Sequence, residues 1–271
     1  ALIDSVAGLF TARAQEKHLR LHVIQDHRLA ARLEGDATRI RQVLSNLVSN
    51  AIKFTDSGRV SLAASVVDEQ DGFQRVRFTI ADTGIGIERD DLSQLFHPFV
   101  QAQGAETRQS GGTGLGLAIS RRIAVLMQGD LQLSSEPGAG TEAVFELRLP
   151  VVEPLRPVPA FDGRRVWLRS DDPWRNEGLS QALSALGFEV LRSGGDTDQV
   201  PPPDMDLLVI DASASAFCDC VPETPCIRVD LLGPLEHEPA QGCVSLPGDP
   251  LFHHAIAEAC SAALGARKPH E

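Results

Sequence analysis

The chain has 271 residues and a formal net charge of −12 at neutral pH. Compact domains usually contain about 100 to 200 residues, so the length predicts two domains. The hydrophobic fraction of 42% and the charged fraction of 23% are typical of a globular protein and exclude a disordered or fibrous chain. The acidic excess argues against a nucleic-acid partner, because proteins that bind a phosphate backbone usually present a basic face. A local basic patch could still hold a single nucleotide.

The sequence also argues against membrane insertion and against structural metal sites. No apolar run reaches the ~18 residues that span a bilayer, and residues 1–10 lack the features of a signal peptide. We therefore expect no membrane contact by this fragment and a cytoplasmic location. An odd number of cysteines without C-x-x-C spacing predicts reduced thiols rather than disulfides or a zinc site; they are Cys218, Cys220, Cys226, Cys243 and Cys260.

Prolines at positions 150, 154, 157 and 159 divide the chain, because each fixes φ and removes a backbone donor. We assign residues 151–162 to a linker between a first domain, 1–150, and a second domain, 163–271. In the first domain the hydrophobic pattern predicts, in chain order, a helix at 2–17, a strand at 19–25, a helix at 38–54, strands at 59–67 and 74–81, a loop at 96–112, a helix at 115–128 and strands at 131–134 and 142–149. This mixture predicts an α/β sandwich.

The helix expected at 38–54 has two different faces. Its apolar residues recur at i, i+3, i+4 and i+7 and form one buried face. At ~100° per residue, a polar stripe lies well away from that face. A solvated surface is the ordinary explanation for such a stripe. Asn is a poor helix former, however, and carboxamide oxygens suit Mg²⁺ while a lysine suits phosphate, so the alternative is a ligand site. The stripe consists of Arg39, Gln42, Asn46, Asn50 and Lys53.

Two glycine-containing segments follow this helix. Residues 82–86, Asp-Thr-Gly-Ile-Gly, come directly after an expected strand; the carboxylate could accept a hydrogen bond from an exocyclic amine, and the glycines could admit a flat ligand. An ordinary turn is the alternative. Residues 111–117 stand where the long loop becomes a helix, and bare N–H groups at a helix start favour an anion. A flexible hinge is the alternative, and the segment matches neither a P-loop nor G-x-G-x-x-G.

In this order and spacing, the segments resemble the nucleotide-binding domain of sensor histidine kinases, whose fold is shared with the GHKL ATPases. Residues 46–55 resemble the N box of that family, 82–86 its G1 box, 96–99 its F box and 112–116 its G2 box. Residues 140–145 are similar to its terminal Gly-Thr strand. The resemblance covers about residues 1–150 and implies a mixed sheet with helices on one face.

The resemblance implies that the first domain binds ATP and Mg²⁺ and transfers the γ-phosphoryl group to a histidine. It assigns Asn50 to the metal, Asn46 to the polar position beside it and Lys53 to the phosphates, and it makes these three the catalytic residues. Asp82 would bind the adenine amine. The other implied nucleotide contacts are Gly84 and Gly86 around the adenine, Arg108 in the lid, Gly112, Thr113, Gly114, Leu115 and Gly116 at the triphosphate, and Thr141 near the adenine.

The acceptor histidine of this family lies on a preceding helical hairpin, and neither His18 nor His97 has the expected His-Glu/Asp setting. The resemblance therefore implies phosphoryl transfer to a dimerisation domain of the same intact kinase, absent from this chain, with a response regulator or phosphotransfer protein downstream. The intact protein would be a larger sensor, with or without a membrane anchor. The alternatives are a pseudokinase scaffold and a GHKL chaperone or topoisomerase ATPase, which usually relies on a glutamate to activate water.

The second domain alternates short apolar strands with a helix. The strands are expected at 165–169, 188–191 and 207–211 and the helix at 177–186, which predicts a doubly wound, flavodoxin-like parallel sheet. Carboxylates that follow its strands would gather at one edge of the sheet.

This domain resembles a receiver domain. Asp211 matches the phosphoryl-acceptor position, and Asp171 fits the acidic cluster that holds Mg²⁺, with Ser170 or Asp172 as its partner. The later positions differ from the family pattern: 230 is Asp where Ser or Thr is expected, and 246 is Leu where Lys is expected. We therefore expect a degenerate receiver with a binding or regulatory role, and a functional receiver is the alternative.

Overall fold

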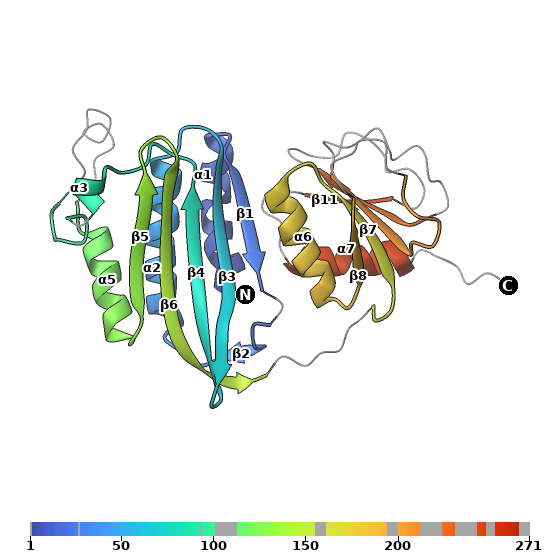
Figure 1. The fold of residues 1–271 in the computed structure, drawn as a ribbon, viewed down its shortest axis with the longest axis horizontal. Coiled ribbons are helices and arrows are strands. Elements are labelled where there is room, and N and C mark those ends of the chain that lie inside the picture. Colours follow the sequence, from blue (N-terminus) through green and yellow to red (C-terminus); the bar gives the residue numbers. More distant parts are fainter. Residues whose placement is uncertain are drawn as a thin grey trace. The chain divides into compact units, whose positions relative to one another are not determined.

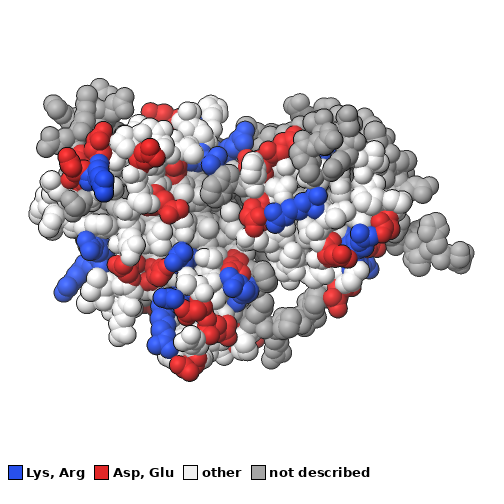
Figure 2. Space-filling view, in the orientation of Figure 1, with Lys and Arg blue, Asp and Glu red and all other residues white. Residues whose placement is uncertain are grey.

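The computed structural model describes residues 2–26, 28–92, 94–100, 113–154, 161–193, 200–211, 224–230, 243–247 and 253–265. The chain divides into two compact units, Ala1–Arg156 and Pro157–Glu271 (Figure 1). Within the described ranges, no helix is both long enough and apolar enough to cross a membrane. On the face drawn in Figure 2, the described Lys and Arg side chains are interspersed with Asp and Glu rather than gathered in one patch.

The first unit contains a mixed six-stranded sheet. Its order is β1-β3-β4-β6-β2, with β5 also paired to β6. β1 runs parallel to β3, and the remaining pairs are antiparallel. The strands are β1 (Arg20–Gln25), β2 (Arg32–Leu33), β3 (Arg59–Gln70), β4 (Phe73–Asp82), β5 (Asp130–Glu136) and β6 (Gly140–Glu153).

The helices of this unit lie on one face of the sheet, as Figure 1 shows for α1 and α2 behind the strands. α2 contacts both α1 and α5. Its predicted apolar face is buried, whereas residues of the polar stripe are exposed or half-buried. Asp36 caps its start by accepting a hydrogen bond from the Arg39 N–H at 3.0 Å. The helices are α1 (Leu2–Glu16), α2 (Ala37–Lys53), the short α3 (Arg89–Leu92) and α5 (Gly116–Leu126).

α1 and α5 end in the same way, with a residue in the left-handed conformation. At the end of α1 this residue is His18, with φ 54°, and the Leu19 N–H bonds back to the Ala14 carbonyl at 2.9 Å. At the end of α5 it is Gln128, with φ 57°. Glycine usually occupies this position, since other residues pay ~1 kcal/mol there. Neither left-handed position is therefore marked by glycine in the sequence, although Gly129 directly follows Gln128.

The linker begins later than the prolines predicted. β6 continues through Pro150 to Glu153, so residues 151–153 belong to the sheet and not to the linker. The added pairing comes from β2, a two-residue strand that the sequence pattern did not predict, with Leu33 opposite Val151. Pro150 is compatible with this strand although it has no N–H, because the pairing uses its carbonyl, which accepts from the Glu34 N–H at 2.9 Å.

The second unit is a five-stranded parallel sheet of order β11-β10-β9-β7-β8. Numbered along the unit, this order is 2-1-3-4-5, which confirms the flavodoxin-like prediction. α6 and α7 pack on one face, and the other face buries Trp167, Leu208 and Ile210. The elements are β7 (Arg165–Arg169), α6 (Pro173–Ala185), β8 (Glu189–Arg192), β9 (Leu207–Asp211), β10 (Cys226–Asp230), β11 (Cys243–Pro247) and α7 (His253–Gly265).

α6 begins four residues before the predicted start at 177. Asp172 acts as its N-cap, since its carboxylate accepts a hydrogen bond from the Arg175 N–H at 3.3 Å. Pro173 occupies the first helical position, where its missing N–H costs nothing. The Asp-Pro pair is thus a helix-start signal, and Asp172 is a cap as well as a member of the predicted acidic cluster.

Candidate functional site

A cavity of about 490 Å³ lies between α2, the end of β4 and the start of α5. The three segments singled out in the sequence all contribute to it. Of the predicted nucleotide contacts, Gly84 and Leu115 are not among the lining residues, and Arg108 and Gly112 lie outside the described residues. Those that line the cavity are Asn46, Asn50, Lys53, Asp82, Gly86, Thr113, Gly114, Gly116 and Thr141.

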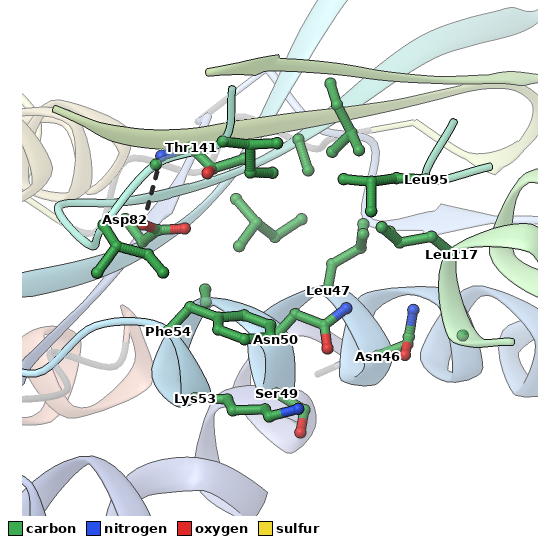
Figure 3. A pocket seen from close by; sticks show the side chains of 18 of the residues that line it. Asn46, Leu47, Ser49, Asn50, Lys53, Phe54, Asp82, Leu95, Leu117 and Thr141 are labelled. Carbon is green, nitrogen blue, oxygen red and sulfur yellow. Dashed lines mark hydrogen bonds between the residues drawn. The ribbon is translucent and has the colours of Figure 1, made fainter. Parts of the chain in front are cut away.

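The amides of α2 form one wall. Figure 3 shows Asn46, Leu47 and Asn50 along the helix, facing the cavity. The Asn46 Nδ2 donates to the buried Ser120 Oγ of α5 at 3.0 Å, which fixes how this amide is turned. A Cβ on Gly116 would stand 2.3 Å from the Asn46 Oδ1, so a larger residue here would displace the Asn46 amide.

The Asp82 carboxylate forms the opposite end of the cavity. Its Oδ1 accepts hydrogen bonds from the N–H groups of Gly84 at 2.8 Å and Thr141 at 3.3 Å, the second drawn in Figure 3. Burial raises the pKa of Asp82 above its ordinary value, although these two bonds and one from the Thr55 side chain oppose the shift. Every one of these donors is neutral. None of these donors neutralises the charge of the carboxylate, so it can still accept a hydrogen bond from a ligand.

Between the two ends, the cavity is lined mainly by apolar side chains. They come from α2, β4, β5, β6, the start of α5 and the segment that contains Leu95, and an apolar lining of this kind suits a heterocyclic base. Gly86 has φ 69°, and a Cβ at this position would stand 2.1 Å from the Glu136 carbonyl oxygen, so only glycine lets the loop cross β5 this closely. The apolar wall residues were not predicted individually; they are Leu47, Ile80, Leu95, Leu117, Leu133 and Ala143.

Two cations line the cavity near α2. The Lys53 ammonium lies over the Phe54 ring, 4.6 Å from its centroid, and in Figure 3 it lies with Ser49 on the side of α2 away from Thr141. Arg13 of α1 is the second cation, and its Nη1 donates to the Ser49 Oγ at 3.5 Å. Arg13 was not predicted as a site residue, because it belongs to a helix without any recognised motif.

The two ends of the long loop meet at the start of α5. The Phe99 N–H donates to the Gly114 carbonyl at 3.0 Å, and the Phe99 ring is 76% exposed. The first turn of α5 has no side-chain cap, since its N-cap is Leu115. A helix start of this kind favours an anion, and anion binding here stays a prediction from the glycine pattern.

The second unit has a different arrangement at the end of β9. The Asp211 carboxylate is bound by the Arg175 Nη1, 2.9 Å from both oxygens, and the side chains of both residues are 1% exposed. The Ser170 Oγ donates to the same carboxylate at 2.8 Å. Asp171 is exposed, and Asp172 caps α6. Over the described ranges no group of three or more His, Cys, Asp or Glu side chains is placed to hold a metal. Arg175 was not predicted.

The comparison with protein families agrees with this geometry. Residues 35–152 match the family of histidine kinase-, DNA gyrase B- and HSP90-like ATPases. Together with the mixed sheet and the cavity, this match defines the first unit as an ATP-binding domain of the GHKL class.

Within this class, the relatives are sensor histidine kinases. GacS of Pseudomonas protegens is 37% identical over 193 residues, which cover 70% of this chain and 21% of GacS. RcsC of Escherichia coli is 36% identical over 218 residues, which cover 79% of this chain and 22% of RcsC. Full-length ShkA in complex with AMPPNP aligns with a TM-score of 0.72 at 28% identity, over 100% of this chain and 56% of ShkA. The chain thus belongs to the hybrid sensor histidine kinases, and it spans about a fifth of the length of GacS and RcsC.

Proposed function

We propose that the first unit binds Mg·ATP in the cavity and donates the γ-phosphoryl group to a histidine on the dimerisation domain of the intact kinase. The observation that carries this proposal is the position of three chemically different groups around one cavity. Asp82 lies at one end, the carboxamides of Asn46 and Asn50 lie along α2, and the uncapped start of α5 lies at the other end. Asp82 can accept a hydrogen bond from an amine. The carboxamides can bind a metal that carries phosphate, and the start of α5 can bind a phosphate oxygen directly.

At the end of the cavity that would hold adenine, Asp82 would recognise the base. Its carboxylate accepts hydrogen bonds, and the exocyclic amine of adenine donates one. The apolar walls would enclose the ring, and Gly86 would leave room at its edge. Thr141 lines the cavity beside Asp82, with its Oγ1 3.0 Å from the Ser135 Oγ. The ligand of ShkA in its solved complex, AMPPNP, is an adenine nucleotide, which supports the same base here.

The phosphate end would be held by α2 and α5. The Asn50 Oδ1 is a hard oxygen donor of the kind that Mg²⁺ accepts, and Asn46 is held beside it by Ser120. When bound, Mg²⁺ neutralises phosphate charge and orients the oxygens of the transferred group. Arg13 and Lys53 would add positive charge near the phosphates, and the N–H groups at the start of α5 would bind phosphate oxygens. The catalytic contribution of the chain is then positioning and charge neutralisation.

Nucleotide titration tests this assignment. Asp82→Ala and Asn50→Ala should each weaken Mg·ATP binding tenfold or more in calorimetric titrations, and Asn50→Ala should also reduce the gain in affinity on adding Mg²⁺. Asp90→Ala, an exposed carboxylate outside the cavity, is the matched control. Wild-type affinity in both site variants would refute the assignment. Mixing with a separately produced dimerisation hairpin should then give phosphohistidine on the hairpin, whereas steady ATP hydrolysis without the hairpin would favour an ATPase of another GHKL type.

We further propose that the second unit is a receiver-like domain that does not take a phosphoryl group. The buried Arg175 guanidinium occupies both oxygens of the Asp211 carboxylate, so the nucleophile is already paired and closed to solvent. Incubation with acetyl phosphate and Mg²⁺ should leave the chain unlabelled. A base-labile, acid-stable adduct on Asp211 would show instead that the ion pair opens and that the receiver is functional.

A further inference from the structure

The C-terminal end of α2 is bound by a lysine from another helix. α2 ends at Lys53, and its C-cap Phe54 has φ −95°, so no left-handed residue closes the helix. The Lys17 ammonium, at the end of α1, donates instead to three carbonyl oxygens. The acceptors are the carbonyls of Ile52 at 3.0 Å, Lys53 at 3.1 Å and Thr55 at 2.8 Å. A cation at this end also matches the negative pole of the helix dipole.

The neighbouring carbonyls at this end of α2 all have donors as well. The Asn50 carbonyl accepts from the Phe54 N–H at 3.0 Å, and the Ala51 carbonyl accepts from the Thr55 Oγ1 at 2.7 Å. The Phe54 carbonyl accepts from the Ile85 N–H at 3.2 Å. A helix leaves its last four carbonyls without intrahelical donors, so outside donors must supply them. Here the donors from other elements are the lysine and the loop that follows Asp82.

This helix end supports the adenine end of the cavity. Thr55 is fully buried; its hydroxyl donates to the Ala51 carbonyl at 2.7 Å and also lowers the pKa of the Asp82 carboxylate, against the effect of burial. The Ile85 N–H joins the loop after Asp82 to the Phe54 carbonyl. A shift of residues 52–55 would therefore move the Thr55 hydroxyl and the loop together, and with them the carboxylate.

The position of Lys17 is itself well defined. It directly precedes His18, the left-handed residue that ends α1, and the Leu19 N–H bonds to the Ala14 carbonyl at 2.9 Å. The next residues enter β1. The lysine side chain is 32% exposed, and its contact with the largely exposed Asp56 at 3.5 Å is of the kind that contributes little. The three carbonyl bonds are thus its main interactions in this structure.

We propose that Lys17 is a positioning residue for the nucleotide site, which clamps the end of α2 and thereby holds Asp82 where it binds the adenine amine. This inference rests on the proposed function for the site itself. Lys17 does not line the cavity, so it acts through the helix end and not by touching the nucleotide.

The test compares Lys17→Met with Arg28→Met. Arg28 is a matched cation, since its Nη2 bonds the Asp26 carboxylate at 2.7 Å and the Val66 carbonyl at 2.9 Å, and none of these residues lines the cavity. Lys17→Met should weaken Mg·ATP binding at least fivefold at temperatures where each variant is fully folded, and Arg28→Met should leave it within twofold. Lys17→Arg should restore most of the affinity because it keeps a charged donor at the helix end.

Two further readouts separate positioning from general loss of stability. Without nucleotide, the amide resonances of Gly84 and Thr141, which donate to Asp82, should shift in Lys17→Met and stay in place in Arg28→Met. With a dimerisation hairpin, Lys17→Met should raise the KM for ATP and leave kcat nearly unchanged. Wild-type affinity and unshifted resonances in Lys17→Met would overturn the inference and leave the proposed function intact. Absence of nucleotide binding by the wild-type chain would refute both the inference about Lys17 and the proposed function.

Discussion

Asp82 and Asp211 each end a strand, one in each unit, and their surroundings differ. Asp82 receives hydrogen bonds from neutral donors and faces a cavity. Asp211 is sealed by the Arg175 guanidinium and is fully buried. A carboxylate with a buried cation has its charge and its acceptor sites used within the fold, whereas one with neutral donors keeps both for a ligand. An internal cation thus distinguishes the strand-terminal Asp that is used within the fold from the one that faces a cavity.

The largest expected effect is on stability, at Asp211. Asp211→Asn would remove the negative charge that pairs with the buried Arg175 guanidinium, and breaking a buried pair in this way costs ~3–5 kcal/mol. Thermal or urea unfolding of the second unit should show this loss. The double variant Asp211→Leu with Arg175→Met should recover much of it, because neither charge of the pair is then left buried without the other. A loss below ~1 kcal/mol for Asp211→Asn would mean that the pair is not closed in solution and would break the comparison.

Asp82→Asn should lower nucleotide affinity and should not lower stability, the opposite of what is expected for Asp211→Asn. The amide nitrogen would meet the adenine amine donor to donor, so affinity for Mg·ATP should fall about 10- to 100-fold, which corresponds to ~1.5–3 kcal/mol for a hydrogen bond to a charged group. Stability should stay unchanged or rise, because burial disfavours the charged form of Asp82. Calorimetry and thermal unfolding of the same preparation check both. A large loss of stability would place Asp82 with Asp211 as a structural residue.

The pH dependence of binding sharpens the contrast. Because burial raises the pKa of Asp82, its carboxylate takes up a proton at a higher pH than an ordinary aspartate does when no nucleotide is bound. Protonation removes an acceptor, so nucleotide affinity should fall on acidification by up to ~tenfold per pH unit below that pKa. The fold itself should gain stability from this group over the same interval, since the folded state then binds the proton more tightly than the unfolded state. Asp82→Asn, titrated in the same buffers, should lack this component; identical profiles would contradict the assignment.

The smallest effect is expected at the hydroxyl beside Asp211. Ser170→Ala removes the 2.8 Å bond to the carboxylate but leaves the guanidinium in place, so the second unit should lose ~1 kcal/mol. Nucleotide affinity of the first unit should not change. Urea unfolding monitored by tryptophan fluorescence reports on this unit, because both tryptophans of the chain, Trp167 and Trp174, belong to it. A loss comparable to that of Asp211→Asn would show that the arginine alone does not hold the carboxylate.

Local patterns predicted much of the fold and of the nucleotide site. The apolar periodicity of α2 placed Asn46 and Asn50 on the wall of the cavity, and the Asp-x-Gly segment after β4 placed Asp82 there too. Boundaries were less accurate. The end of β6 depends on pairing with β2, and the start of α6 depends on a cap, so neither follows from hydrophobic alternation.

By itself, the sequence determined which residue types stand at strand ends and on helix faces, because these follow from spacings of two to four residues. Only the tertiary structure decided what each of them contacts. Arg175 lies 36 residues from Asp211, Ser120 lies 74 from Asn46, and Lys17 lies 35 to 38 from the carbonyls it binds. Such contacts form only when distant elements pack together. No local pattern could therefore show that one aspartate is open to a ligand and the other is already neutralised.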